Sequence, residues 1–417
     1  MIFNTIVTNI VVVIINFITS MLAARLLGAE GRGELAIILL YPQLIATMGV
    51  LGVDRSLSLL GGKGITKPSL KFIMVLSTLF SIPIVTAIFY VVEAKIENSD
   101  LVELSLLYSA YVPALYVFMF SSAFFNGAGM FKQFNISKLS FYLSYVLVLI
   151  ILGQLLDDLL QVFLYSNLAS AYVAALVSLF FLIKEDEKGP VDNIFKNITL
   201  TLKKARYYII PGVLIILSSK IDLIMASDFF SIELLGVFVV YLAYAHLLGP
   251  LEMAVNTHML HYGIIYSEKS AMFTIRVTLF VFISGSALLA LISPFAVGLL
   301  YGDEYLVEIH ALQILSFSSF FYFSFKNMNE YMIGRSLVNQ DSISSVIFIV
   351  TFAIFAYILI FWYQFTGLIL AVLLANMVRF LYIIKVFRNR MKVSFSEFLI
   401  VNRKDVVRIM ENIKRLK

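Results

Sequence analysis

The stretch IVTNIVVVIINFITSMLAARLL at residues 6–27 decides the fold, because Arg25 is its only charged residue. An apolar run of about 20 residues can cross the roughly 30 Å hydrocarbon core of a bilayer as a helix. The run does not alternate polar and apolar residues with a period of two, which excludes a membrane β-strand. It is too long for a signal-peptide core and lacks a preceding basic segment, so we expect a retained first transmembrane helix.

Apolar runs of the same kind recur along the whole chain. The 417 residues are 61% hydrophobic and 14% charged, whereas soluble domains carry about 25% charged residues. The sequence therefore predicts an all-α integral membrane protein with about twelve transmembrane helices. The expected spans are 6–27, 36–60, 72–92, 102–126, 136–156, 159–183, 207–229, 234–258, 273–299, 308–332, 343–364 and 366–388.

Two sequence echoes suggest that the chain consists of two related halves. Leu26-Leu27-Gly28 with Pro42 recurs as Leu234-Leu235-Gly236 with Pro250, 208 positions later in each case (28 to 236, 42 to 250). A second echo pairs Gly129 and Ser137 with Gly334 and Ser342, 205 positions later (129 to 334, 137 to 342). In membrane transporters two such halves usually face each other across the substrate path.

Basic residues are distributed unevenly between alternate loops. Lys and Arg are concentrated in the predicted loops 61–71, 127–138 and 184–206 and in the segment after 384. Acidic residues predominate in loops 93–103, 153–158 and 300–308. The positive-inside rule then places both termini in the cytoplasm, and an even number of spans agrees with this.

The charge pattern also predicts the domain organisation. With six spans in each half, both halves enter and leave the membrane on the same side and are parallel repeats. We expect six-helix bundles at 1–183 and 207–388, joined by a cytoplasmic linker at 184–206. Residues 389–417 are predicted to form a basic amphipathic helix that lies on the cytoplasmic leaflet.

Composition and motifs exclude several function classes. The chain has no cysteine, which rules out disulfides, thiolate nucleophiles and cysteine-ligated metals. Its four histidines are not spaced as a metal site, and no Gly-rich phosphate loop opens a soluble domain. We therefore expect no enzyme, no metal, no resident cofactor and no nucleic-acid partner.

Four stretches in order along the chain resemble the lipid-linked oligosaccharide flippases of bacterial O-antigen and capsule synthesis. These flippases belong to the multidrug/oligosaccharidyl-lipid/polysaccharide (MOP) exporter superfamily. The stretches are ARLLGAEGRGELA (24–36), GVDRSLSLLGG (52–62), IDLIMASDFFSIELLGVFVVYLA (221–243) and PFAVGLLYGDEYLVEIHALQIL (294–315).

The resemblance implies a fold, a substrate and partners. It implies two six-helix bundles in a V shape, around a cavity that opens alternately to each side of the bacterial inner membrane. The implied substrate is an undecaprenyl-diphosphate-linked oligosaccharide that moves from the cytoplasmic to the outer leaflet. The implied partners are membrane lipids, a polysaccharide polymerase and a chain-length regulator. A proton or a sodium ion is a candidate coupling ion, and the sequence does not decide between them.

Charged residues within spans are the candidate functional residues, because each costs about 2.5–3.5 kcal/mol on insertion scales. For a diphosphate head we select Arg25, Arg55 and Lys220, which supply cationic donors, together with Asp222. Asp222 is predicted to share a helix face with Ser218, while Lys220 points elsewhere. Interfacial snorkelling of the arginines and structural ion pairing of Lys220 are the alternatives.

A second set concerns coupling and movement. Asp54 is a candidate for a gate with its neighbour Arg55. His246 and Glu252 are candidates for ion coupling, because a buried imidazole or carboxyl changes its affinity for protons. Pro42 and Pro250 are each expected to break a helix at a matching depth and act as hinges. Structural roles remain open for each, and Arg379 is interpreted as an interfacial anchor.

Two rival functions are weighed against the flippase. A multidrug or cation antiporter of the same superfamily would favour an acidic lining, whereas the candidate lining here carries both signs. A membrane-embedded polysaccharide polymerase would need an acid/base constellation, and often a large outer loop, which the short predicted loops do not provide.

Overall fold

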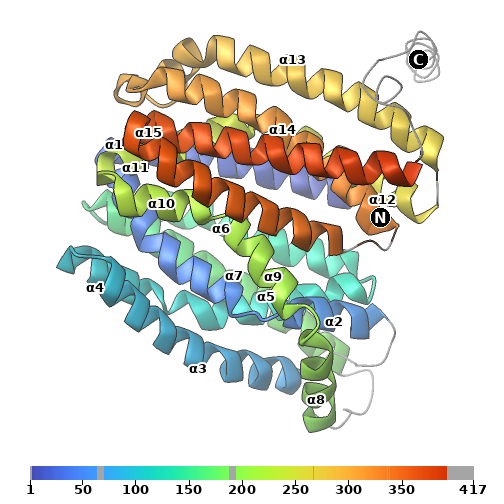
Figure 1. Ribbon diagram of the computed structural model, residues 1–417. Coiled ribbons are helices and arrows are strands. Elements are labelled where there is room, and N and C mark those ends of the chain that lie inside the picture. The colour runs from blue at the N-terminus through green and yellow to red at the C-terminus, as the bar shows by residue number, and fades with distance from the viewer. Residues whose placement is uncertain are drawn as a thin grey trace, which may run out of the picture. The chain divides into compact units, whose positions relative to one another are not determined.

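Every regular element in the described part of the chain is a helix (Figure 1). The computed structural model describes residues 2–62, 70–186, 194–265, 267–335, 337 and 339–391. The chain divides into two compact units, Met1–Val239 and Val240–Lys417, and the boundary between them lies within helix α11 (Ile232–Ala245). The division into bundles at 1–183 and 207–388 stays a prediction.

The N-terminal unit contains ten helices before α11 in its described residues, and α5, α6 and α7 pack against one another within it. Its core gathers around buried aromatic residues of α4 and α5, among them Tyr108, Tyr116 and Phe120. The helices are α1 (Ile2–Met48), α2 (Val53–Gly62), α3 (Leu70–Lys95), α4 (Ser99–Tyr108), α5 (Tyr111–Gly127), α6 (Phe131–Leu152), α7 (Leu159–Asp186), α8 (Ile194–Ala205), α9 (Ile209–Ser218) and α10 (Ile221–Phe229).

In the C-terminal unit, α14 packs against α12, α13 and α15. Its core contains buried Phe323, Phe325 and Met328 of α14 and Phe387 of α15. The elements are the 3₁₀ turn η1 (His246–Leu248), α12 (Gly249–Ile264), α13 (Glu268–Leu300), the 3₁₀ turn η2 (Asp303–Leu306), α14 (Ile309–Gly334) and α15 (Asn339–Met391).

Eight helical runs in the described residues are long and apolar enough to cross a membrane, or nine if the bent pair α9–α10 counts as one span. The prediction of an all-helical, multi-pass membrane protein is confirmed at this level. The two longest runs each contain a kink, at Gly28 (φ 70°) in α1 and at Gln364 (φ 47°) in α15. Helix α14 is 26 residues long but is not among the eight.

The predicted continuous seventh span is wrong in its geometry, because the helix breaks between Ser218 and Ile221. Helices α9 and α10 meet there at a bend of 50°. The hydroxyls of Ser218 and Ser219 donate to the carbonyls of Ile215 and Ile216, and such back-bonding competes with the helical ladder. Residues on the two sides of this break do not share a helix face.

The two echoed glycine pairs serve different physical purposes. Gly28 and Gly129 adopt left-handed backbone conformations, with φ of 70° and 73°, which glycine accepts without strain. Gly236 and Gly334 instead lie in helices at close crossings. A Cβ atom on Gly236 would lie 1.9 Å from the Ala29 carbonyl oxygen, and one on Gly334 would lie 2.3 Å from that of Leu260. The echoed glycines are therefore not equivalent in structure.

The two echoed prolines also differ. Pro42 is buried inside α1, which stays helical through it. Pro250 lies in the first turn of α12, directly after η1, where a missing N–H costs little. The expected break at a matching depth is therefore wrong, whereas a hinge role at either proline stays a prediction.

The predicted linker and tail are only partly described. Within 184–206, residues 194–205 form helix α8, which packs on α2, and Ser56 Oγ donates to the Thr201 carbonyl at 2.8 Å. Most of the predicted tail helix, residues 392–417, lies outside the described residues.

Candidate functional site

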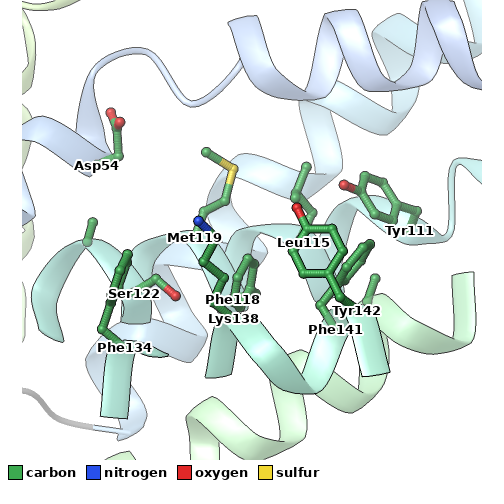
Figure 2. A pocket seen from close by; sticks show the side chains of 12 residues that line it. Asp54, Tyr111, Leu115, Phe118, Met119, Ser122, Phe134, Lys138, Phe141 and Tyr142 are labelled. Carbon is green, nitrogen blue, oxygen red and sulfur yellow. The ribbon is translucent and has the colours of Figure 1, made fainter. Parts of the chain in front are cut away.

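A cavity of about 340 Å³ lies within the N-terminal unit, between α2, α5, α6 and α7 (Figure 2). Most of its lining consists of aromatic and aliphatic side chains, and a few polar groups interrupt them. The lining residues are Asp54, Tyr111, Leu115, Phe118, Met119, Ser122, Ala123, Phe134, Lys138, Phe141, Tyr142 and Ala171.

One face of α6 forms a wall of the cavity. Phe134, Lys138, Phe141 and Tyr142 have the spacing i, i+4, i+7, i+8, which brings side chains to the same side of a helix. The ammonium of Lys138 donates a hydrogen bond to Asn9 Oδ1 at 2.8 Å. Since an ammonium carries three donors, this bond leaves others for a ligand.

The other polar groups come from α2 and α5. Asp54 lies half-buried in the first turn of α2, where the helix dipole favours a carboxylate. Ser122 of α5 is 7% exposed, and its hydroxyl has no hydrogen-bond partner among the residues that the structure describes. An unpaired buried hydroxyl costs about 1–3 kcal/mol, so the cavity contains a polar group that a ligand would satisfy.

Arg25, Asp54 and Arg55 were selected from the first two predicted spans for head-group binding or gating. Of these three, only Asp54 lines the cavity. Its neighbour Arg55 is exposed and does not line it. Arg25 is exposed on α1, three residues before the kink at Gly28.

Lys220 and Asp222 lie at the bend between α9 and α10. Lys220 has non-helical backbone angles (φ −133°, ψ −8°) and precedes the first turn of α10, which contains Asp222. The Asp222 carboxylate accepts a hydrogen bond from the Leu223 N–H at 2.8 Å. The two charged residues therefore lie next to a break between helices α9 and α10.

His246 and Glu252 lie on the two sides of Pro250 in the C-terminal unit. His246 is exposed in η1, and its ring lies edge-on to that of Tyr322 at 5.4 Å between centroids. Glu252 is 9% exposed and accepts a hydrogen bond from the Asn256 amide. The buried carboxyl of Glu252 thus has a neutral hydrogen-bond donor one helical turn away.

The interpretation of Arg379 as an interfacial anchor is wrong. Its side chain is 4% exposed, and its guanidinium carbon lies 3.9 Å from the Phe325 ring centroid and 5.6 Å from that of Phe348. Its Nη2 donates to Ser345 Oγ at 3.3 Å. Packing between α14 and α15 holds this cation inside the C-terminal unit, because aromatic faces attract a desolvated guanidinium.

A second polar cluster joins α1, α3 and α10 in the N-terminal unit. Lys95 Nζ lies 2.8 Å from Asp228 Oδ2 in an ion pair. The Tyr41 hydroxyl donates to Asp228 Oδ1 at 3.3 Å and lies 3.2 Å from Ser227 Oγ. The side chains of Lys95 and Asp228 are 45% and 31% exposed, so solvent reaches the pair.

Sequence analysis missed Lys138 as a site residue because it counted this lysine among the basic residues of the loop 127–138. In the structure α6 begins at Phe131, so Lys138 lies two turns inside a helix. The helical spacing of Phe134, Lys138, Phe141 and Tyr142 was the signal that could have revealed it. Asp228 was missed because its partners are distant in sequence and no local pattern indicates them.

Comparison with known proteins places this architecture in a family. Residues 2–258 match the profile of a family described as polysaccharide biosynthesis protein, which is more than half of the chain. The chain belongs to the polysaccharide biosynthesis protein family. No curated protein matches it by sequence.

Solved structures show which fold this family member adopts. The lipid II flippase MurJ in an inward closed conformation aligns with a TM-score of 0.74 at 16% identity, covering 95% of this chain and 89% of that one. An inward-facing multidrug resistance MATE transporter of the MOP superfamily aligns with a TM-score of 0.71 at 15% identity, covering 91% and 94%. A MOP superfamily transporter from Pyrococcus furiosus gives 0.59 at 16% identity, covering 94% and 93%.

The family and the fold bear on two predictions from the sequence. The resemblance to polysaccharide proteins of the MOP superfamily is confirmed at the level of family and superfamily fold. The fold is shared with solved transporters, which agrees with the expectation of a transporter and not a polymerase.

Proposed function

We propose that this protein is a flippase that moves an undecaprenyl-diphosphate-linked oligosaccharide from the cytoplasmic to the outer leaflet for surface polysaccharide synthesis. The family match over residues 2–258 carries the proposal, because it connects the chain to polysaccharide biosynthesis. The fold shared with a lipid II flippase supports the movement of a lipid-linked sugar. No covalent chemistry is involved.

The proposed transporter has twelve spans and works by alternating access. The kinks at Gly28 and Gln364 would each divide one long helical run into two spans. If α9–α10 counts as a single bent span and the 26-residue α14 is included, the described helices give twelve. An even number of spans agrees with two cytoplasmic termini in a bacterial inner membrane, as the basic loops predict.

The proposed head-group residues are Arg25, Arg55, Lys220 and Asp222. The exposed guanidinium groups of Arg25 and Arg55 can offer planar donors to a diphosphate. Lys220 and Asp222 lie at a backbone break, a place where membrane transporters often bind polar substrates.

We assign coupling and gating to a second group. The buried carboxyl of Glu252, and His246 on the other side of Pro250, are the candidates for a proton or sodium coupling step, and Asp54 for gating. Pro42 and Pro250 are proposed as hinges. The proposed partners are the lipid-linked oligosaccharide, membrane lipids, a polysaccharide polymerase and a chain-length regulator.

A deletion strain of the native host tests the function. We expect lipid-linked repeat units to accumulate on the cytoplasmic leaflet while surface polysaccharide disappears. Wild-type protein should restore both, whereas Lys220→Ala or Arg55→Ala at equal expression should not. The proposal is wrong if repeat units in the deletion strain reach the outer leaflet and remain unpolymerised there.

The fold shared with multidrug MATE transporters favours a second candidate, a multidrug or cation antiporter. The two functions separate in the same strain. An antiporter predicts greater sensitivity to cationic drugs with unchanged surface polysaccharide, and the flippase predicts the reverse.

A further inference from the structure

We propose that the cavity between α2, α5, α6 and α7 binds a single uncharged sugar ring of the transported glycan. This inference rests on the proposed function and names the part of the substrate that the cavity takes. The diphosphate and the lipid are then held elsewhere, by the residues proposed for the head group.

The size of the cavity favours one ring. Ligand pockets usually measure about 300–1,000 Å³, and this cavity, at about 340 Å³, lies at the lower end of that range. An oligosaccharide with its diphosphate does not fit in such a space, whereas one pyranose ring does.

The walls have the chemistry of a sugar site. Phe118 and Phe141 stack at 6.5 Å between centroids with an interplanar angle of 23°, and Phe134, Tyr111 and Tyr142 continue the aromatic lining. Aromatic faces carry partial negative charge, so they attract the weakly positive C–H groups on one face of a pyranose. An extended, flexible acyl chain would not need rigid rings at this density.

The polar groups complement hydroxyls and not ions. Asp54 is an acceptor, Lys138 is a donor with N–H groups to spare, and the Ser122 hydroxyl can do both. Asp54 would repel a phosphate and Lys138 would repel a cationic drug, because like charges disfavour each other at close range. The hydroxyls of a neutral polyol can donate and accept, so they suit all three of these groups, which line the cavity in Figure 2.

Ser122 gives the sharpest test, because its buried hydroxyl has no hydrogen-bond partner in the described part of the chain, while the hydroxyl of its neighbour Ser121 has one. Ser121 is fully buried and its Oγ donates to the Val117 carbonyl at 2.6 Å. Removing the Ser122 hydroxyl should therefore leave thermal stability unchanged or raise it. Removing that of Ser121 leaves the cavity lining intact and serves as the matched control.

The experiment uses the purified full-length chain in detergent micelles. Binding of the methyl glycosides of glucose, galactose and N-acetylglucosamine is measured by saturation-transfer NMR, with inorganic pyrophosphate and tetraphenylphosphonium as charged probes. We expect at least one glycoside to bind. Ser122→Ala should weaken that binding by about twofold to tenfold, the value of one hydrogen bond, and Ser121→Ala should not. Ala171→Leu, which fills the cavity, should abolish the binding.

Several results would overturn the inference. It fails if no glycoside binds, if only pyrophosphate or tetraphenylphosphonium binds, or if Ser122→Ala and Ala171→Leu both bind glycoside as well as wild type. The binding assay does not require transport, so its outcome is independent of the flippase test. A chain that binds glycosides but does not move lipid-linked sugar would contradict the proposed function and leave the sugar site standing.

Discussion

Lys138 in the N-terminal unit and Arg379 in the C-terminal unit are both basic residues inside apolar helices, yet their surroundings differ. Lys138 lines an open cavity and donates to Asn9. Arg379 is 4% exposed, lies over the Phe325 ring and donates to Ser345. The comparison teaches that the cost of a charge in a span can be reduced by a cavity with a hydrogen-bond acceptor or by aromatic packing. Only the first arrangement leaves the cation available to a substrate.

The largest difference in stability loss is expected between two aromatic residues, Phe325 beside Arg379 and Phe118 in the cavity lining. Phe325→Ala should cost about 3–5 kcal/mol of stability, because it leaves a void in a filled core beside a buried cation. Phe118→Ala should cost about 1–2 kcal/mol, because this ring is half-buried and faces a cavity that already exists. Reversible unfolding by SDS titration in mixed micelles measures both. Equal losses would show that the two environments are not distinct.

The close helix crossings should behave alike in the two units. Gly236→Ala and Gly334→Ala each place a Cβ against a backbone oxygen, so each should cost near the upper end of about 1–3 kcal/mol. Gly212→Ala is the control, because a Cβ there meets no atom of the described residues within 4 Å and should stabilise α9 by up to about 1 kcal/mol. The same titration tests all three. A neutral Gly236→Ala or Gly334→Ala variant would contradict the packing described for its unit.

Replacing Arg379 with lysine and Lys138 with arginine tests the comparison directly. Arg379→Lys should lose about 2 kcal/mol, since an ammonium does not stack on Phe325 as a planar guanidinium does. Lys138→Arg should change stability by less than about 0.5 kcal/mol, because the cavity leaves room for the larger head. If Arg379→Lys is as stable as wild type, stacking on Phe325 does not hold the buried charge.

The smallest effect is expected at an exposed cation. Lys95→Met breaks the ion pair with Asp228, and solvent-exposed pairs contribute about 0.2–1 kcal/mol. The loss should shrink as salt is added. Lys132→Met, at an exposed position of α6, should leave the unfolding midpoint unchanged. A loss well above 1 kcal/mol for Lys95→Met would show that this pair is more desolvated than its exposure indicates.

Hydropathy predicted the helical membrane fold because each span must be apolar over its length, and that requirement is local in the sequence. The bend at Lys220 was not predictable from hydropathy, since α9 and α10 together are apolar enough to form one continuous span. The sugar-sized cavity includes Asp54, which was selected from its charge. Lys138 was counted in a loop and Arg379 at a membrane interface, because charge alone does not reveal which neighbours surround a side chain.

The most direct test of the central claim uses purified protein reconstituted into vesicles that contain a fluorescent undecaprenyl-diphosphate oligosaccharide in both leaflets. A membrane-impermeant glycosidase is added, and the fraction of lipid that it cleaves is followed. A flippase lets the enzyme reach nearly all of the labelled lipid, whereas protein-free vesicles stop at the outer-leaflet half. If vesicles that contain correctly folded protein also stop at half under every ion gradient applied, the flippase account is contradicted.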